Sequence, residues 1–115
     1  MADYTFNKEN KIFPTAEKFS LTDKVAYNDG SVVSKIIIRN ERGNLTLFAF
    51  DKGEFLSEHT APFDAILQVL DGQCEVVIDG VSFDLIVGES IIMPANVRHS
   101  VIATEKFKML LTMIK

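Results

Sequence analysis

Short runs of β-forming residues, each closed by a turn signal, follow one another along most of the chain. Valine, isoleucine, leucine and phenylalanine dominate the runs, and glycine, often after aspartate, or proline stands between them. Runs of this length and spacing are typical of all-β sandwiches and barrels rather than of βαβ units. The candidate strands are Ser31–Arg39, Leu45–Phe50, Phe63–Leu70, Gln73–Ile78, Val81–Leu85, Ser90–Met93, His99–Ala103 and Phe107–Ile114. We therefore expect an all-β sandwich or barrel of short strands.

The length of the chain fits one domain. Its 115 residues, 47% of them hydrophobic, can bury one core but are too few for two. We assign residues 1–115 to a single barrel domain. Residues 1–20 carry little strand pattern and are interpreted as an N-terminal arm or covering strand, in which Thr15–Phe19 indicates a helical turn.

Charge and composition argue against several kinds of partner. The 16 acidic and 12 basic residues give a net charge of −4, and no run of lysine and arginine could follow a phosphate backbone. No apolar run is long enough to span a bilayer, and the first residues lack a signal-peptide pattern. A single cysteine, Cys74, excludes an internal disulfide. We expect a cytoplasmic protein that binds neither nucleic acid nor membrane.

Two Asp-Gly pairs predict tight hairpin turns, which fix the residues that face each other across the strands. A turn at Asp79-Gly80 predicts the pairs Ile78–Val81, Val76–Phe83 and Cys74–Leu85. A turn at Asp71-Gly72 predicts the pairs Val69–Cys74, Leu67–Val76 and Ala65–Ile78. Because side chains alternate along a strand, one face of this three-stranded meander is entirely apolar and forms the interior.

The other face of the meander is mixed. One row holds the polar residues Gln68, Glu75 and Asp84. Ile66, Leu70 and Val77 on the same face are more apolar than contact with water requires. A covering N-terminal strand or a homodimer partner would explain them.

The two histidines of the chain, His59 and His99, each lie where a loop meets a strand. Neutral imidazole is the commonest metal ligand in proteins, so a fold that brings the two together would create a candidate metal site. If the strand that holds Phe63 extends regularly backwards, Ala61 and His59 share its inner face. The competing interpretation is that both histidines are ordinary structural residues.

The residues around the histidines resemble the two motifs of the cupin superfamily. The first motif spaces glycine, histidine, histidine, glutamate and glycine, and this chain has Gly53, His59, Ala61, Ala65 and Gly72 at those positions. The second spaces glycine, proline, glycine and histidine, and here Gly88, Pro94, Asn96 and His99 stand there. Asparagine tolerates the left-handed backbone better than most residues other than glycine. The resemblance implies an all-β, cupin-type barrel, a double-stranded β-helix or jelly roll of about 8–10 short antiparallel strands.

The same resemblance implies a divalent metal held by three histidines and a glutamate, of which this chain keeps only His59 and His99. Iron, manganese, nickel or zinc are the candidates, and each would need a replacement ligand. Gln68 or Asp64 could serve if a bulge near Pro62 turned them inward. Further alternatives are Glu54 and Glu58 from the preceding loop and Cys74 on the inner face. Arg98 could meet an anionic ligand at the mouth or lie on the surface.

Three functions remain open. The first is a binding barrel that closes around a small, largely apolar ligand, with His59 and His99 as polar contacts. Its expected pocket residues are His59, Ala61, Phe63, Ala65, Leu67, Val76, Phe83, His99 and Val101. The second is a metal-dependent enzyme, such as the dioxygenases and isomerases that the resemblance suggests. The third is a structural or regulatory module that uses the barrel to form a homodimer.

Overall fold

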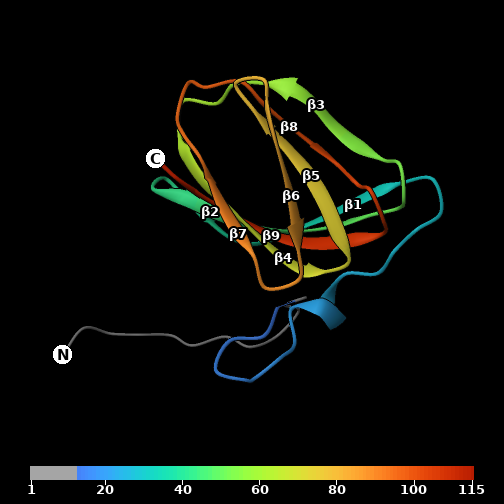
Figure 1. Cartoon of the computed structure of the whole chain (residues 1–115). Coiled ribbons are helices and arrows are strands. Elements are labelled where there is room, and N and C mark those ends of the chain that lie inside the picture. Colours follow the sequence, from blue (N-terminus) through green and yellow to red (C-terminus); the bar gives the residue numbers. More distant parts are fainter. Residues whose placement is uncertain (1–12) are drawn as a thin grey trace.

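The computed structural model describes residues 13–115, which form nine strands and one turn of 3₁₀ helix (Figure 1). The elements are η1 (Thr22–Lys24), β1 (Val32–Asn40), β2 (Gly43–Phe50), β3 (Phe55–His59), β4 (Asp64–Asp71), β5 (Gln73–Ile78), β6 (Val81–Ile86), β7 (Ser90–Met93), β8 (His99–Ile102) and β9 (Phe107–Ile114). All but one of the strands correspond to a run expected from the sequence. The exception is β3, in which Ser57 and Glu58 interrupt the apolar pattern.

The strands form two antiparallel sheets that face each other. The larger sheet has the order β1-β2-β9-β4-β7, and the smaller one has the order β3-β8-β5-β6. Figure 1 shows the sheets as the two walls of a short barrel. The expected all-β fold of short antiparallel strands is therefore confirmed.

The core lies between the sheets because alternate residues of each strand point inward. The central part of the core contains Phe50 and Phe107, whose rings stack with centroids 4.5 Å apart, and neither side chain reaches solvent. The other buried members are Ala65, Leu67, Val69, Cys74, Val76, Leu85, Met93, Val101, Ala103 and Met109. Each large apolar side chain buried in this way stabilises the fold by about 1.5–3 kcal/mol.

One of the two predicted hairpins forms. The Asp79-Gly80 turn gives the expected pairs between β5 and β6, including Val76 with Phe83. Both turn residues have positive φ, 49° and 80°, as a two-residue hairpin turn of this kind requires. The polar pair Glu75 and Asp84 also lies opposite as expected.

The predicted Asp71-Gly72 hairpin is wrong. β4 pairs with β9 and β7 in the larger sheet, while β5 belongs to the smaller one, so the chain changes sheets at Gly72. Gln68 therefore does not share a row with Glu75. The pairing of β4 with β9 joins residues far apart in the sequence, and local turn signals cannot reveal such a pairing.

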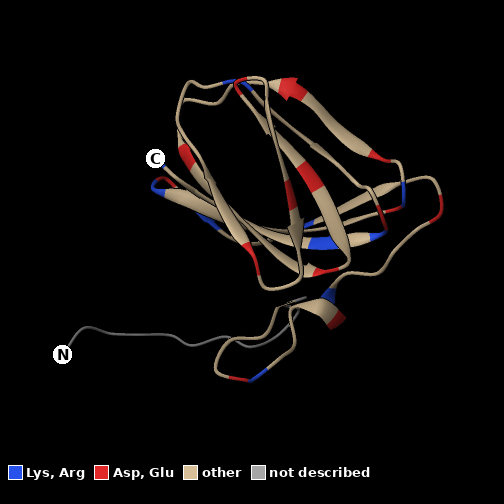
Figure 2. Cartoon of the chain, in the orientation of Figure 1, with Lys and Arg blue, Asp and Glu red and all other residues tan. Residues whose placement is uncertain are grey.

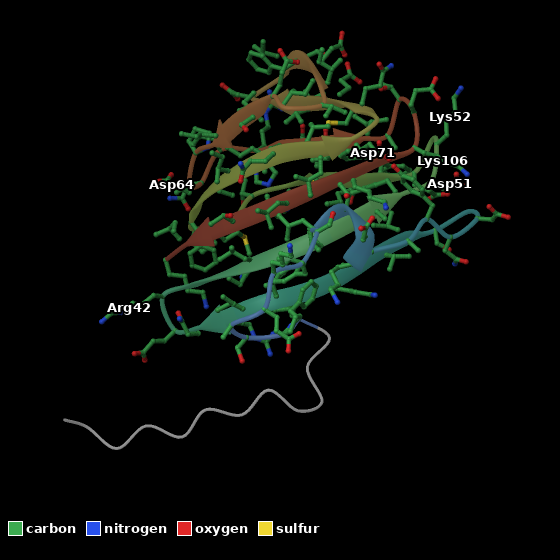
Figure 3. The ribbon with its side chains drawn as sticks, turned by 90° about the horizontal axis from the view of Figure 1, so that it is seen from below. Arg42, Asp51, Lys52, Asp64, Asp71 and Lys106 are labelled. Carbon is green, nitrogen blue, oxygen red and sulfur yellow. The ribbon has the colours of Figure 1, made fainter. Side chains whose placement is uncertain are left out.

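Residues 13–27 cover part of the outer face of the larger sheet (Figure 3). Phe13 and Val25 are buried against Leu47, Ala49 and Leu110. Polar contacts hold the same segment: the Lys108 ammonium donates to the Thr22 carbonyl at 2.6 Å, and the Tyr27 hydroxyl donates to Asp71 at 2.5 Å. This cover also packs on Leu70, which explains one of the three outer apolar residues.

The expected helical turn at Thr15–Phe19 is not formed, and the turn found instead is η1. The part of the expected N-terminal arm in residues 1–12 lies outside the described residues.

Within residues 13–115, no helix has the length and apolar character needed to cross a membrane.

The change of sheet at Gly72 generates a testable prediction. Its φ is 71°, and an added Cβ would lie 1.8 Å from the Lys106 carbonyl oxygen, which is backbone and cannot move aside easily. Gly88 has a similar φ of 89°, but an added Cβ there meets nothing within 4 Å. We expect Gly88→Ala to lower the free energy of unfolding by about 1–2 kcal/mol through backbone strain alone. Gly72→Ala should cost at least about 3 kcal/mol because overlap is added to the strain.

Urea unfolding followed by circular dichroism measures both free energies. Gly88→Ala is the matched control, since it changes the same residue type at nearly the same φ. Equal losses in the two variants would contradict the close approach of β9 to Gly72.

Candidate functional site

The two histidines lie side by side on neighbouring strands. β3 pairs with β8 in the smaller sheet, and His59 is directly opposite His99. The ring centroids are 4.4 Å apart, and the ring planes are inclined at 68°. His99 is buried, with 6% of its surface exposed, whereas His59 is exposed to solvent. One buried and one accessible imidazole therefore meet at the edge of the interior.

The chain brings His59 to this place by a route that differs from the one expected. β4 begins only at Asp64, and residues 60–63 connect it to β3 in the other sheet. His59 is thus not a backward extension of the strand that holds Ala65. A register shift between Leu56 and His59 aligns its ring with that of His99.

Both rings are held by the same kind of hydrogen bond. Nδ1 of His59 lies 2.7 Å from the carbonyl oxygen of Ser57, and Nδ1 of His99 lies 3.0 Å from that of Val97. A carbonyl oxygen can only accept, so each Nδ1 carries the hydrogen and donates it. In the neutral ring Nε2 is then unprotonated, with its lone pair available to a metal or to a hydrogen-bond donor.

The surroundings of the pair on the same sheet are apolar. Ile78 is opposite both His99 and Val81, which places these residues in one row with His59. The next row contains Leu56, Val101, Val76 and Phe83. Because β6 is the last strand of the sheet, Val81 and Phe83 remain 56% and 41% exposed. The histidines therefore lie at an apolar mouth that is open on the β6 side.

The residues expected to line an interior pocket divide into three groups. Leu67, Val76 and Val101 are packed in the core, and Ala65 is buried beside them on β4, so they support the mouth from beneath. Ala61 and Phe63 lie in the half-buried connection between β3 and β4, where the Lys115 ammonium stands 5.3 Å from the Phe63 ring centroid. Phe83 is 41% exposed because β6 has no further strand beside it, so this residue lies at the open edge of the site.

The second motif spans β7 and the loop that precedes β8. Asn96 has the left-handed φ of 65° that the motif glycine would adopt, and its N–H donates to the Ala61 carbonyl at 2.7 Å. The neighbouring Ala95 N–H donates to a carboxylate oxygen of Asp64 at 2.8 Å. These two bonds tie the loop before His99 to the segment that follows His59.

The residues considered as replacement ligands do not complete a metal site. Asp64 and Gln68 alternate with the buried Ala65, Leu67 and Val69, so their side chains lie on the outer face of β4. Cys74 is on the inner face but four residues from Ile78 along β5, a distance of about 13 Å.

Glu58 is engaged on the surface, with an oxygen 3.9 Å from the Arg98 guanidinium. Arg98 lies closer to Asp79, at 3.3 Å, so this arginine joins two surface carboxylates. Figure 2 shows such acidic and basic residues interspersed along the strands and loops of the described chain.

The donor set does not fit the metal centre that the cupin motifs imply. Among residues 13–115, no three His, Cys, Asp or Glu side chains are grouped so that they could hold a metal ion. Zinc enzymes and non-haem iron oxygenases use at least three protein ligands. This chain offers two imidazoles, with Ala61 and Ala65 at the other two ligand positions of the motifs, and falls short of that number.

The comparisons with known proteins agree with this fold. The model of the cupin domain family matches residues 46–115, which include both histidines. The chain therefore belongs to the cupin family, and the expected membership is confirmed. No curated protein matches the chain.

Several solved structures are similar over most of the chain. A conserved protein of unknown function from Streptococcus pyogenes is 30% identical, with a TM-score of 0.86 over 100% of this chain and 97% of its own. A cupin superfamily protein from Desulfitobacterium hafniense is 25% identical, with a TM-score of 0.85 over 90% of this chain and 95% of its own. A cupin 2 conserved barrel domain protein from Leptotrichia buccalis is 44% identical, with a TM-score of 0.83 over 84% of this chain and 47% of its own.

The environment of Cys74 predicts how stability depends on pH. Burial, and then the charge of Asp84, raise the pKa of this thiol from 9.0 to about 12. In the unfolded chain the thiol ionises near its ordinary value, while in the folded chain it stays protonated. Between about pH 9 and 12 the unfolded state therefore binds fewer protons, and the free energy of unfolding falls by up to about 1.4 kcal/mol per pH unit.

Urea unfolding at several pH values, with Cys74→Ala as the comparison, isolates this contribution. We expect a steeper fall for the wild type than for the variant as the pH rises above 9.0. Parallel pH profiles would show that the thiol ionises equally well in the folded state.

Proposed function

We propose that the protein binds a small, largely apolar molecule at the mouth of the barrel, and that His59 and His99 recognise a hydrogen-bond donor on it. The observation that supports this most directly is the pair of Nδ1 bonds to the Ser57 and Val97 carbonyls. They orient both rings and leave two Nε2 acceptors for a ligand. The ring centroids are 4.4 Å apart, so both acceptors are within reach of one small molecule.

The neighbours of the histidines define the rest of this ligand. Val81 and Phe83 expose apolar surface on the open side of the mouth, and Ile78 lies between Val81 and His99. Ligand sites commonly combine such apolar walls with a few placed polar groups. A compact apolar body that carries a hydroxyl group matches both features.

A matched pair of probes tests the proposal. 4-Methylphenol and toluene have nearly the same shape, but only the phenol can donate a hydrogen bond to Nε2. We expect the phenol to bind about fivefold more tightly, since one such bond is worth about 1 kcal/mol. Two-dimensional ¹H–¹⁵N NMR of the histidine side chains should show both rings protonated at Nδ1 in the free protein and a shift of Nε2 on addition of the phenol.

Variants assign the effect to the mouth. His59→Phe keeps an exposed ring but removes one acceptor, so it should reduce the preference for the phenol. Val87→Ala changes an exposed apolar residue between β6 and β7 and serves as the control. Equal affinities for the two probes, or a phenol that leaves both histidine spectra unchanged, would refute the proposal.

A metal-dependent enzyme is the second candidate, because fixed Nδ1–H groups are also the arrangement by which proteins orient imidazole ligands. It would require a ligand from outside the described set, such as the bound molecule itself. Elemental analysis of the purified protein separates the two candidates. Stoichiometric iron, manganese, nickel or zinc, lost in His99→Ala, would favour the enzyme.

A further inference from the structure

Three charged residues lie behind the row that contains His59, His99 and Ile78. Each of them is the chain neighbour of one member of that row, namely Glu58, Arg98 and Asp79. All three are exposed, because side chains next to inward-facing ones point to the outer side of a sheet. The charged group and the histidine row are therefore two sides of the same stretch of backbone.

Arg98 joins the other two charged residues. Its Nε lies 3.3 Å from a carboxylate oxygen of Asp79, and its Nη1 lies 3.9 Å from one of Glu58. The Asp79 N–H also donates to the Arg98 carbonyl at 2.9 Å. A Cβ added at Gly80 would lie 3.5 Å from Nη2, so the guanidinium rests against the turn between β5 and β6. One side chain thus connects β3, the start of β8 and the β5–β6 turn.

The end of β3 is the part of the smaller sheet that needs such a connection. β3 is an edge strand that pairs only with β8, and its register shifts between Leu56 and His59. Ser57 and Glu58 therefore lie together opposite the single residue Ser100. At such a bulge the strand pairing does not by itself determine which side chains face the interior. A Glu58 carboxylate held on the outer side leaves the next side chain, His59, facing inward.

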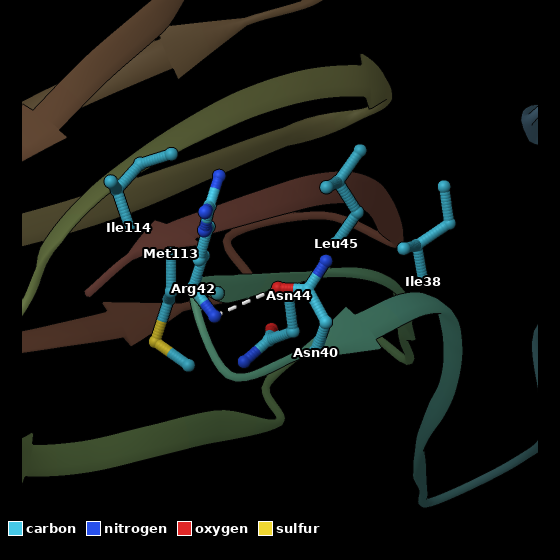
Figure 4. Close-up of a pocket in the computed structure, with 8 residues that line it drawn as sticks. Ile38, Asn40, Arg42, Asn44, Leu45, Met113 and Ile114 are labelled. Carbon is cyan, nitrogen blue, oxygen red and sulfur yellow. Dashed lines mark hydrogen bonds between the residues drawn. The ribbon is translucent and has the colours of Figure 1, made fainter.

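Arg42 on the larger sheet offers a contrast. Figure 4 shows it beside Ile114, at a hollow of about 190 Å³. The ion pairs found among residues 13–115 do not include Arg42. Its positive charge can therefore be removed without breaking an ion pair of the described chain.

We propose that Arg98 is a positioning residue of the histidine site. By holding Glu58 outside, it keeps the Nε2 acceptors of His59 and His99 together, and this role rests on the proposed function of that pair. Exposed ion pairs contribute modestly, so loss of the link weakens the alignment rather than abolishing it. Salt has the same effect, because the screening length falls to about 3 Å at 1 M.

The nuclear Overhauser effect between carbon-bound protons of the two imidazoles tests the alignment in the free protein. Ring centroids 4.4 Å apart place these protons close enough for a direct effect in the wild type. We expect Arg98→Gln and Glu58→Gln each to reduce its intensity about twofold or more, since His59 then faces inward for only part of the time. Melting temperatures show that both variants are folded. An unchanged effect in Arg98→Gln would overturn the inference, whether or not a ligand binds.

Two variants serve as controls for this measurement. Asp79→Asn leaves the link between Arg98 and Glu58 intact, and asparagine tolerates the positive φ of 49° at this position. Arg42→Gln removes the same charge as Arg98→Gln from the larger sheet. Both should keep the ring-to-ring effect at the wild-type intensity, and its loss in Arg42→Gln would assign the change to net charge instead.

The ligand pair of the proposed function tests the consequence for binding. Arg98→Gln should lower the preference for 4-methylphenol over toluene from about fivefold to about twofold and leave the affinity for toluene unchanged. Both probes are uncharged, so 1 M salt should reduce the wild-type preference through the ion pair and leave that of the variant unchanged. An equal preference in the two proteins would overturn the positioning role. If the wild type shows no preference, the proposed function fails and the ring-to-ring effect alone decides the inference about Arg98.

Discussion

The pairing of β9 with both β2 and β4 is the constraint on which the rest of the structure depends. β9 is the middle strand of the larger sheet, and it joins the last residues of the chain to segments that precede it by about half the chain length. Two glycines are required by this placement, because an added Cβ at Gly43 or Gly72 would overlap a carbonyl oxygen of the β9 region. The position of β9 also sends β5 to the opposite sheet. In that sheet β5 pairs with β8 and places Ile78 opposite His99.

The histidine pair is a product of the smaller sheet alone. The backbone pairing of β3 with β8 sets the position of both rings, and the carbonyls of residues two positions earlier in the chain set their rotation. The larger sheet contributes Ala65 to the core, and the cupin motif has a glutamate at this position of the sequence. What remains is a pair of oriented acceptors with an apolar edge beside them. This chemistry suits recognition of a donor group better than tight coordination of a metal.

The sequence was sufficient to predict the class of fold, the strands with strong β pattern, and the family. It also predicted the β5–β6 register, because a two-residue Asp-Gly turn determines the neighbouring pairs locally. It did not reveal the partners of β4. Several strands have a similar apolar pattern, so the pattern alone does not distinguish β9 and β7 from β5 as neighbours of β4. For the same reason the sequence did not reveal how far Phe83 is exposed. The alternation of side chains along β6 correctly predicts which face of the sheet holds Phe83. It does not predict whether another strand covers the edge of β6, because that depends on the arrangement of the whole sheet.

Alternation along β4 separates the interior of the barrel from the outer face of the larger sheet. Ala65 points into the barrel toward the core, while Asp64 and Ile66 on either side of it point outward to the face with Arg42 and Ile114. The surfaces still share one structural connection. The Asp64 carboxylate accepts a hydrogen bond from the Ala95 N–H. The N–H of the next residue, Asn96, donates to the Ala61 carbonyl in the segment that follows His59. A carboxylate on the outer face thus also steadies the loop that leads to His99, so the outer charge and the inner imidazoles are constrained by the same short turn.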